Sequence, residues 1–313
     1  MQKHQVTVLK RLFKDTNTTY LTLMKIMVPA IIVIKVLEEL GIVKWLAGGL
    51  DPLMDIVGLP GEMGLVWATC IFANIYSALI IFFTQTDYSS FSVMQMSVLA
   101  SMMLIVHALP IEGVITQKAG LKWIYTIILR IGGAFLFGFL TNYLCSSLGL
   151  LQQPVTFEYI PLNNSGQNLW EWALEQLYGL ALLYFVLLGL IILLKVMNKV
   201  GINRMLEYLM APVLGRLGIS NKATYMTLIG MTLGLAYGGG LLIYESKKDT
   251  LSKKDILLSI CLISLFHSII EDTLVVLIIG PNLWVILFFR LLYALAIVYA
   301  INKLAFASEK RGV

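Results

Sequence analysis

Long apolar runs, separated by short polar or glycine-rich segments, occupy most of the chain. Several of these runs reach about 20 residues, which is the length that an α-helix needs to cross a bilayer. Their apolar positions are consecutive, whereas the strands of a membrane β-barrel alternate apolar and polar side chains. The pattern therefore predicts an all-α polytopic membrane protein.

Composition supports this class of protein. Of the 313 residues, 58% are hydrophobic and only 13% are charged, whereas soluble domains carry about 25% charged residues. The net charge of +5 comes without a basic patch interleaved with aromatic residues, so a nucleic acid is not an expected partner. The first 18 residues are polar and basic and contain no apolar core of a signal peptide, so we expect the first membrane helix to direct insertion. The lipid bilayer is thus the partner that the composition requires, and a homo-oligomer is left open.

The chain matches itself when it is shifted by 160 positions, without a gap, from about residue 30 to residue 145. The matched pairs are of types that chance would not keep in one register, among them Pro52 and Pro212, Gly58 and Gly218, His107 and His267, Gly120 and Gly280, and Arg130 and Arg290. A period this long indicates two halves of one fold and not a solenoid of short units.

Each half should contain the same series of elements. The series is an apolar helix (20–37 and 176–197), an amphipathic connector broken at Pro52 or Pro212, an apolar run interrupted by small or polar residues (62–83 and 222–244), a long helix with a histidine and an acid (92–119 and 252–279), and a last helix (121–146 and 282–304). The expected parts of the chain are a cytoplasmic N-terminal segment (1–19), a first repeat (20–147), an extracytoplasmic linker (148–175), a second repeat (176–305) and a cytoplasmic tail (306–313).

Charged residues orient the two halves in the membrane. Basic residues gather on the cytoplasmic side, and the first connector is acidic whereas the equivalent second connector is basic. Every charged segment falls on its expected side if each interrupted run is a re-entrant hairpin, so that each half crosses the membrane three times. The sequence thus predicts two inverted-topology repeats, each with three spanning helices, one re-entrant helical hairpin and an amphipathic connector. Both termini should be cytoplasmic, with the protein in the cytoplasmic (inner) membrane of a bacterium.

The tips of the two hairpins carry small or polar residues. Backbone at such a tip is tolerated at membrane depth only where it is buried in protein or lines a wet cavity. The residues that mark the tips are Asn74, Tyr76, Ser77, Tyr237, Gly238, Gly239 and Gly240. We therefore expect a cavity at the tips.

Each half also carries a histidine and acidic residues in the middle of an apolar run, where ionisable groups are costly without a partner or a function. These residues are His107 and Glu112 in the first half, and His267, Glu271 and Asp272 in the second. On a continuous helix His267 and Glu271 would share one face, with Asp272 beside them. Inverted symmetry would bring the two groups together near the membrane midplane.

Two arginines accompany these acids. Arg130 and Arg290 lie on the last helices at about the depth of the carboxylates of their own halves, so we expect them to form structural ion pairs. The second half then has one surplus acid, Glu271 or Asp272, which is free to hold a proton, a cation or a substrate.

Imidazole and carboxylate groups together suit a first-row divalent metal, and they also suit proton coupling around a polar solute. No cofactor is required, but a bound divalent metal ion is compatible with the set His107, Glu112, His267, Glu271 and Asp272. The alternative is that the histidines bond backbone carbonyls and that all the buried charges pair with one another.

Three segments resemble one known family: Gly234-Leu-Ala-Tyr-Gly-Gly-Gly240, Leu251-Ser-Lys-Lys-Asp255 and His267-Ser-Ile-Ile-Glu-Asp-Thr273. They are similar to the nucleoside-recognition, or Gate, domain family of bacterial membrane proteins, which includes spore maturation proteins. That family is related to the membrane parts of the ferrous-iron transporter and of concentrative nucleoside transporters. The resemblance covers nearly the whole chain as two Gate repeats, is closer in the second, and implies inverted repeats with hairpins. It does not fix the substrate, and the chain lacks the GTPase domain of the iron transporter.

These observations favour a membrane transporter that moves a small cation, above all a divalent metal, or a proton- or cation-coupled polar solute by alternating access around the histidine and acid site. A nucleoside-type solute is one alternative, although only Asn74, Tyr76 and Tyr237 offer the amide and aromatic groups that it would need at the tips. A scaffold or regulatory subunit that transports nothing is the other. An enzyme is not expected, because no nucleophile is paired with a base by spacing.

Overall fold

The computed structural model describes residues 42–85, 91–156, 169–246 and 251–305, together with separate residues between 10 and 40, and some side chains within these ranges are left undescribed. Nearly all of the described residues are helical, and they contain no strand, only an isolated β-bridge between Ser92 and Pro154. The all-α fold class is thus confirmed for this part of the chain. The segment 1–19 lies mostly outside the described residues and the tail 306–313 wholly outside them, whereas the described residues of the helix predicted over 20–37 are helical.

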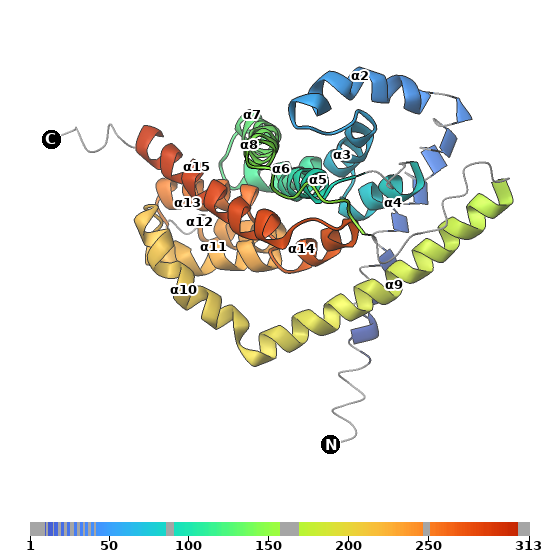
Figure 1. Ribbon diagram of the computed structural model, residues 1–313. Helices are drawn as coiled ribbons and strands as arrows, with labels where there is room; N and C mark the ends of the chain where they lie inside the picture. Colours follow the sequence, from blue (N-terminus) through green and yellow to red (C-terminus); the bar gives the residue numbers. More distant parts are fainter. Residues whose placement is uncertain are drawn as a thin grey trace.

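The helices follow one another in the same order in both halves (Figure 1). The first half contains α2 (Ile42–Ile56), α3 (Glu62–Phe72), α4 (Ile75–Gln85), α5 (Val93–Val106), α6 (Leu109–Lys118) and a last helix built from α7 (Trp123–Ile127), η2 (Ile128–Gly132) and α8 (Gly133–Leu148). The second half contains α9 (Leu169–Val200), α10 (Ile202–Arg216), α11 (Asn221–Leu233), α12 (Leu235–Ser246), α13 (Lys253–Leu265), α14 (Glu271–Val276), η3 (Leu277–Ile279), η4 (Trp284–Phe289) and α15 (Arg290–Ala305). Helices α2 and α10 match at both ends under a shift of 160.

The repeat also governs how helices begin. Ser92 accepts a hydrogen bond from the backbone N–H of Gln95, whose side chain accepts one from the N–H of Ser92, and Ser252 and Asp255 form the same capping box. Such a box satisfies two N–H groups that the first turn of a helix would otherwise leave free. The sequence therefore fixes the starts of α5 and α13 in the same way.

Helices α2 and α10 run through Pro52 and Pro212, so the predicted breaks at these prolines are wrong. A proline removes one intrahelical hydrogen bond and kinks or breaks many helices. Here each proline lies within a helix of 15 residues that continues on both sides of it.

The predicted long helices over 92–119 and 252–279 are likewise not continuous. Helices α5 and α6 are bent by 44° at a break, and α13 and α14 are separated by residues 266–270. In these breaks Ala108 has a φ of 48° and its counterpart Ser268 a φ of 47°. This left-handed backbone is costly for residues other than glycine, so the two equivalent strained positions mark a feature that the whole fold enforces.

Each half contains a helical hairpin, α3 with α4 and α11 with α12. In the second hairpin the chain reverses at Gly234, whose φ is 102°. Gly230 and Gly238 then face each other, because a Cβ added to Gly238 would lie 2.2 Å from the Cα of Gly230. The chain therefore reverses before the predicted tip residues: Gly238 lies in the first turn of α12, and Gly239 and Gly240 follow it within the helix.

The first hairpin reverses between Phe72 and Ile75. At its tip the Asn74 side-chain oxygen accepts a hydrogen bond from the N–H of Ser77 at 2.8 Å, which caps the start of α4. Tyr76 and Ser77 lie in the first turn of α4, so these predicted tip residues are at the tip.

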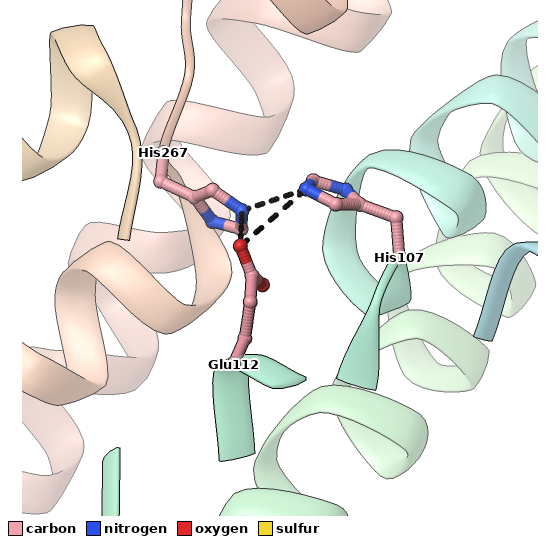
Figure 2. Close-up of side chains that lie close together, drawn as sticks. All are labelled: His107, Glu112 and His267. Atoms are coloured by element: carbon pink, nitrogen blue, oxygen red, sulfur yellow. Dashed lines mark hydrogen bonds and ion pairs between the residues drawn. The ribbon is translucent and has the colours of Figure 1, made fainter. Parts of the chain in front are cut away.

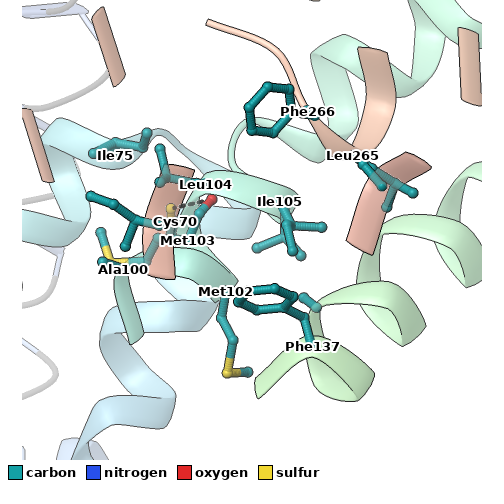
Figure 3. Packing of buried hydrophobic residues seen from close by; sticks show 14 of the residues in the cluster. Cys70, Ile75, Ala100, Met102, Met103, Leu104, Ile105, Phe137, Leu265 and Phe266 are labelled. Atoms are coloured by element: carbon teal, nitrogen blue, oxygen red, sulfur yellow. Dashed lines mark hydrogen bonds between the residues drawn. The ribbon is translucent and has the colours of Figure 1, made fainter. Parts of the chain in front are cut away.

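Helix α5 lies at the centre of the molecule and is buried from Met94 to Val106, except at Gln95. Other parts of the protein therefore cover this helix on all sides. Figure 3 shows Met102 of α5 near Phe137 of α8, both in a core that also includes Leu265 of α13. The core thus joins the two halves around α5.

Two described helices are long and apolar enough to cross a membrane, Trp123–Leu148 and Trp284–Ala305, and the bent pair of α5 and α6 would make a third if it is one span. Both long helices agree with the last helices predicted for the two halves. The inverted orientation of the halves, the re-entrant depth of the hairpins and the domain boundaries remain predictions.

Candidate functional site

The two helix breaks bring the two histidines into contact. His107 follows the last residue of α5, and His267 lies in the segment between α13 and α14. Their Nε2 atoms are 3.0 Å apart, although the residues are separated by 160 positions (Figure 2). The two halves therefore meet at these rings.

Each histidine also faces an acid from the opposite half. Glu112 Oε1 lies 3.2 Å from His267 Nε2, and Asp272 Oδ2 lies 3.3 Å from His107 Nε2. Glu112 Oε1 is 3.7 Å from the ring nitrogen of His107 in its own half. Glu112 and Asp272 are equivalent under the shift of 160, so the contacts are reciprocal between the halves.

The expected pairing of His267 with Glu271 along one helix face does not occur. His267 lies outside the helix, and Glu271 is the first residue of α14. The side chain of Glu271 instead accepts a hydrogen bond from the Tyr76 hydroxyl at 3.3 Å. Asp272, not Glu271, is thus the acid of the second half that joins the histidine pair.

The donor atoms have the spacing of a metal site. His107, Glu112 and His267 are all buried, and one donor atom from each lies within 4.8 Å of the others. A tetrahedral ion with ligands at about 2.0–2.1 Å would hold its donors about 3.3 Å apart. The three pairs among these residues are separated by 3.0, 3.2 and 3.7 Å, and Asp272 lies 3.3 Å from His107 alone.

The rings present one nitrogen each to this cluster. The Nδ1 atoms of His107 and His267 are buried and have no hydrogen-bond partner among the described residues. When two neutral imidazoles face each other through Nε2, one must donate and the other accept. A cation between them would instead use the lone pair of both Nε2 atoms.

Arg130 holds the first half of the cluster in place. It is completely buried and forms an ion pair through Nη1 with Glu112 Oε2. It also donates from Nε to the carbonyl of Ile105 at 2.6 Å and from Nη2 to the carbonyl of His107 at 2.9 Å. The guanidinium therefore fixes both the broken end of α5 and the carboxylate that faces the other half.

Arg290 lacks these contacts, contrary to the expectation of an ion pair. Its side chain is also completely buried, but none of its three nitrogens has a hydrogen-bond partner among the described residues, and it forms no ion pair with them. The guanidinium carbon lies 4.7 Å from the centre of the Phe266 ring. The equivalent arginines thus have different surroundings.

Each hairpin packs against the opposite half. Tyr76 in α4 reaches Glu271 at the start of α14. In the second hairpin a Cβ added to Gly239 would lie 2.6 Å from the Cγ2 of Ile115 in α6. Gly240 has open space around its Cα, and the side chain of Tyr237 lies outside the described residues.

The amino-acid sequence of the chain is similar to sequences of known membrane proteins. The Gate family, described as nucleoside recognition, matches residues 20–122. An uncharacterized membrane protein from Bacillus subtilis (strain 168), YvoD, is 26% identical over 291 residues, which are 91% of this chain and 90% of that protein. No solved structure matches the chain.

The Gate match ends just after α6 and therefore contains the first hairpin, His107 and Glu112. The motifs that carry the resemblance in the sequence lie in the second half, outside the matched residues. The apolar helices and the membrane-protein relative place the chain in a membrane.

The site also contains residues that the sequence did not indicate. The carbonyl of Cys70 in α3 accepts a hydrogen bond from the N–H of Ala108 at 3.0 Å. In the second half the carbonyl of Met231 in α11 accepts one from the N–H of Ile269 at 2.9 Å. The first helix of each hairpin thus holds the helix break of its own half through the backbone, for which side-chain patterns give no signal.

Proposed function

We propose that the protein is a membrane transporter that moves a small cation, with a divalent metal favoured, by alternating access around His107, Glu112, His267 and Asp272. The observation that carries this proposal is the convergence of His107, Glu112 and His267, whose donor atoms lie within 4.8 Å of one another, with Asp272 Oδ2 3.3 Å from His107 Nε2. Imidazole and carboxylate ligands together suit first-row divalent metals. Glu271 is proposed to act through Tyr76 on the first hairpin, outside the ligand set.

The location of the cluster supports transport over permanent storage of an ion. The histidines lie at the helix breaks and the two acids in the first turns of the helices that follow, and discontinuous helices bind ions and substrates in transporters built from two repeats. The side chains of Glu112 and Asp272 keep a small exposed fraction, 12% and 13%. We propose a bacterial inner membrane with both termini in the cytoplasm, as the charged segments suggest.

A nucleoside-type solute is the second candidate. The family description supports it, and so do two polar groups at the tip of the first hairpin. The Asn74 amide nitrogen and the Ser77 hydroxyl are buried without a hydrogen-bond partner among the described residues. A solute with hydroxyl or amide groups would satisfy them.

The test is uptake of manganese, cobalt or zinc ions, and in separate samples of uridine and adenosine, into proteoliposomes. We expect metal uptake by the wild type and its loss in His267→Ala and Asp272→Asn. Asp55→Asn removes an exposed carboxylate on α2 and serves as the matched control with unchanged uptake. Thermal unfolding of each purified variant shows whether it is folded.

Uptake of a nucleoside without a metal would favour the second candidate. If nothing moves and the site variants only lose stability, the transporter proposal fails. A scaffold with structural buried charges would then be the remaining reading of the site.

A further inference from the structure

Arg290 is a fully buried cation without a hydrogen bond or an ion pair among the described residues. Its close contact is with the face of the Phe266 ring, 4.7 Å away. A buried charge without a partner is strongly destabilising, and within a membrane such a residue needs a partner or a function. The conformation described above does not provide Arg290 with that partner.

Arg130, the counterpart of Arg290, shows what the missing partners are. In the first half Arg130 binds the carbonyls of Ile105 and His107 and the carboxylate of Glu112. A shift of 160 converts this set into Leu265, His267 and Asp272. We call the contacts of Arg130 with two carbonyls and one carboxylate a clamp. All the groups that would form the equivalent clamp around Arg290 are present in the chain, next to the same type of helix break.

The two breaks differ in backbone conformation. In the first half Val106 is the last helical residue and His107 follows it with φ −51° and ψ 149°. In the second half the helix ends at Leu265, and Phe266, the counterpart of Val106, has φ −145° and ψ 85°. The second helix thus ends one position earlier, which changes the direction of the carbonyls that Arg290 would need.

A ligand from solution is a poor partner for Arg290 in this conformation. All three nitrogens of its guanidinium are buried, and Phe266 covers one face of the group. The acceptors must therefore reach Arg290 through a movement of the protein itself. The first half shows the backbone conformation that the second half would have to adopt, because its carbonyls already bind Arg130.

We propose that the protein has a second conformation in which Arg290 forms an ion pair with Asp272 and donates to the carbonyls of Leu265 and His267, while Arg130 releases its own set. Two halves of similar sequence can adopt each other's local conformation, and in repeat transporters one half moves against the other around a fixed site. The inference rests on the proposed alternating-access function and deepens it: exchange of the clamp opens the site to the other side of the membrane. Both arginines are positioning residues and not ligands of the cation.

The exchange is tested by labelling a reporter cysteine from the two sides of the membrane. Ser268→Cys puts a thiol in the second break at a partly exposed position, and the native Cys70, Cys145 and Cys261 are buried. The variant is placed in vesicles of either orientation and treated with a membrane-impermeant maleimide. With both arginines present, we expect labelling from both sides.

Arg290→Met should abolish the second conformation, so that labelling from one side falls at least tenfold while labelling from the other side persists. Because the variant removes an unpaired buried charge, its melting temperature should not fall below that of the wild type. Lys303→Met removes an exposed charge from the same helix as Arg290 and should label like the parent.

Two-sided labelling of Arg290→Met at the parent rate would overturn the inference, and so would one-sided labelling of the parent or a clear loss of stability in Arg290→Met. Arg290→Lys controls for a disturbance of packing by methionine. It keeps the charge but not the planar fork, and it should show the same one-sided labelling. Labelling needs no metal. If labelling behaves as expected and no metal binds, the proposed substrate fails and this inference stands. If metal transport is the same in the wild type and in Arg290→Met, this inference fails and the proposed function stands.

Discussion

The Nε2 atoms of His107 and His267 lie 3.0 Å apart, although the two residues are separated by 160 positions and belong to different halves of the chain. Each ring leaves its helix at a break, and each faces the acid of the other half. A site built in this way exists only while the two halves are docked. Any movement between the halves must therefore change the distances among the four donor groups, which is the property that a transport site needs.

Asp272 and Glu271 are neighbours with different roles, and a pair of amide substitutions separates them. Asp272→Asn should weaken the protection of the protein by zinc or manganese ions against thermal unfolding, because one ligand oxygen of the cluster loses its charge. We expect a loss of affinity of at least tenfold, which corresponds to about 1.4 kcal/mol. Glu271→Gln, whose side chain contacts Tyr76, should keep the protection. Equal loss in both variants would contradict the assignment of Asp272 to the site.

Protection by the metal should also depend on pH. A metal ion binds a neutral imidazole and must displace a proton from a protonated one. The rise in melting temperature caused by the metal should therefore be largest at about pH 8 and should shrink towards about pH 5. The comparison is made against metal-free protein at each pH, so that the acid sensitivity of the fold itself is subtracted. A metal effect that grows with acidification would speak against imidazole ligands.

Arg130 should be essential for stability. Arg130→Met leaves the buried carboxylate of Glu112 and the carbonyls of Ile105 and His107 without their donor, and removing one partner of a buried ion pair costs about 3–5 kcal/mol. We expect a clearly lower melting temperature in detergent. Arg216→Met changes an exposed arginine on α10 and is the matched control. If both variants melt together with the wild type, the clamp described for Arg130 does not hold the fold.

Much of the architecture could be predicted from the sequence, because it depends on repeated residue types. The register of 160 paired His107 with His267, and the apolar pattern placed the last helices close to Trp123–Leu148 and Trp284–Ala305. The convergence of the histidines and acids from two halves also followed from the repeat. These features come from burial and periodicity, which a single sequence displays directly.

The details of the site could not be predicted in the same way. The left-handed backbone of Ala108 and Ser268 breaks both helices, and nothing in an alanine or a serine announces that conformation. A continuous helix was therefore expected, with Glu271 on the face of His267 and Asp272 beside it. The different surroundings of Arg130 and Arg290 depend on a break that begins one residue earlier, which an almost symmetric sequence does not reveal.

The capping boxes at Ser92 and Ser252 should contribute equally to stability in the two halves. Replacing an N-cap serine by alanine removes a hydrogen bond to the first turn and costs about 0.5–2 kcal/mol. Ser92→Ala and Ser252→Ala should lower the melting temperature by similar amounts. Ser146→Ala, at an exposed position near the end of α8, should change it little. A large difference between the first two variants would show that the starts of α5 and α13 are held by different contacts.

The second hairpin depends on the close approach of Gly230 and Gly238. Gly238→Ala would place a Cβ 2.2 Å from the Cα of Gly230, so α11 and α12 would have to separate. We expect a lower melting temperature and, under the proposed function, impaired transport. Gly240→Ala lies in the same helix and its Cβ would meet nothing within 4 Å, so it should be neutral or stabilise the helix by up to about 1 kcal/mol. If Gly238→Ala is as stable as Gly240→Ala, α11 and α12 do not require close packing between Gly230 and Gly238. Close packing of this hairpin then does not position the helices next to the site.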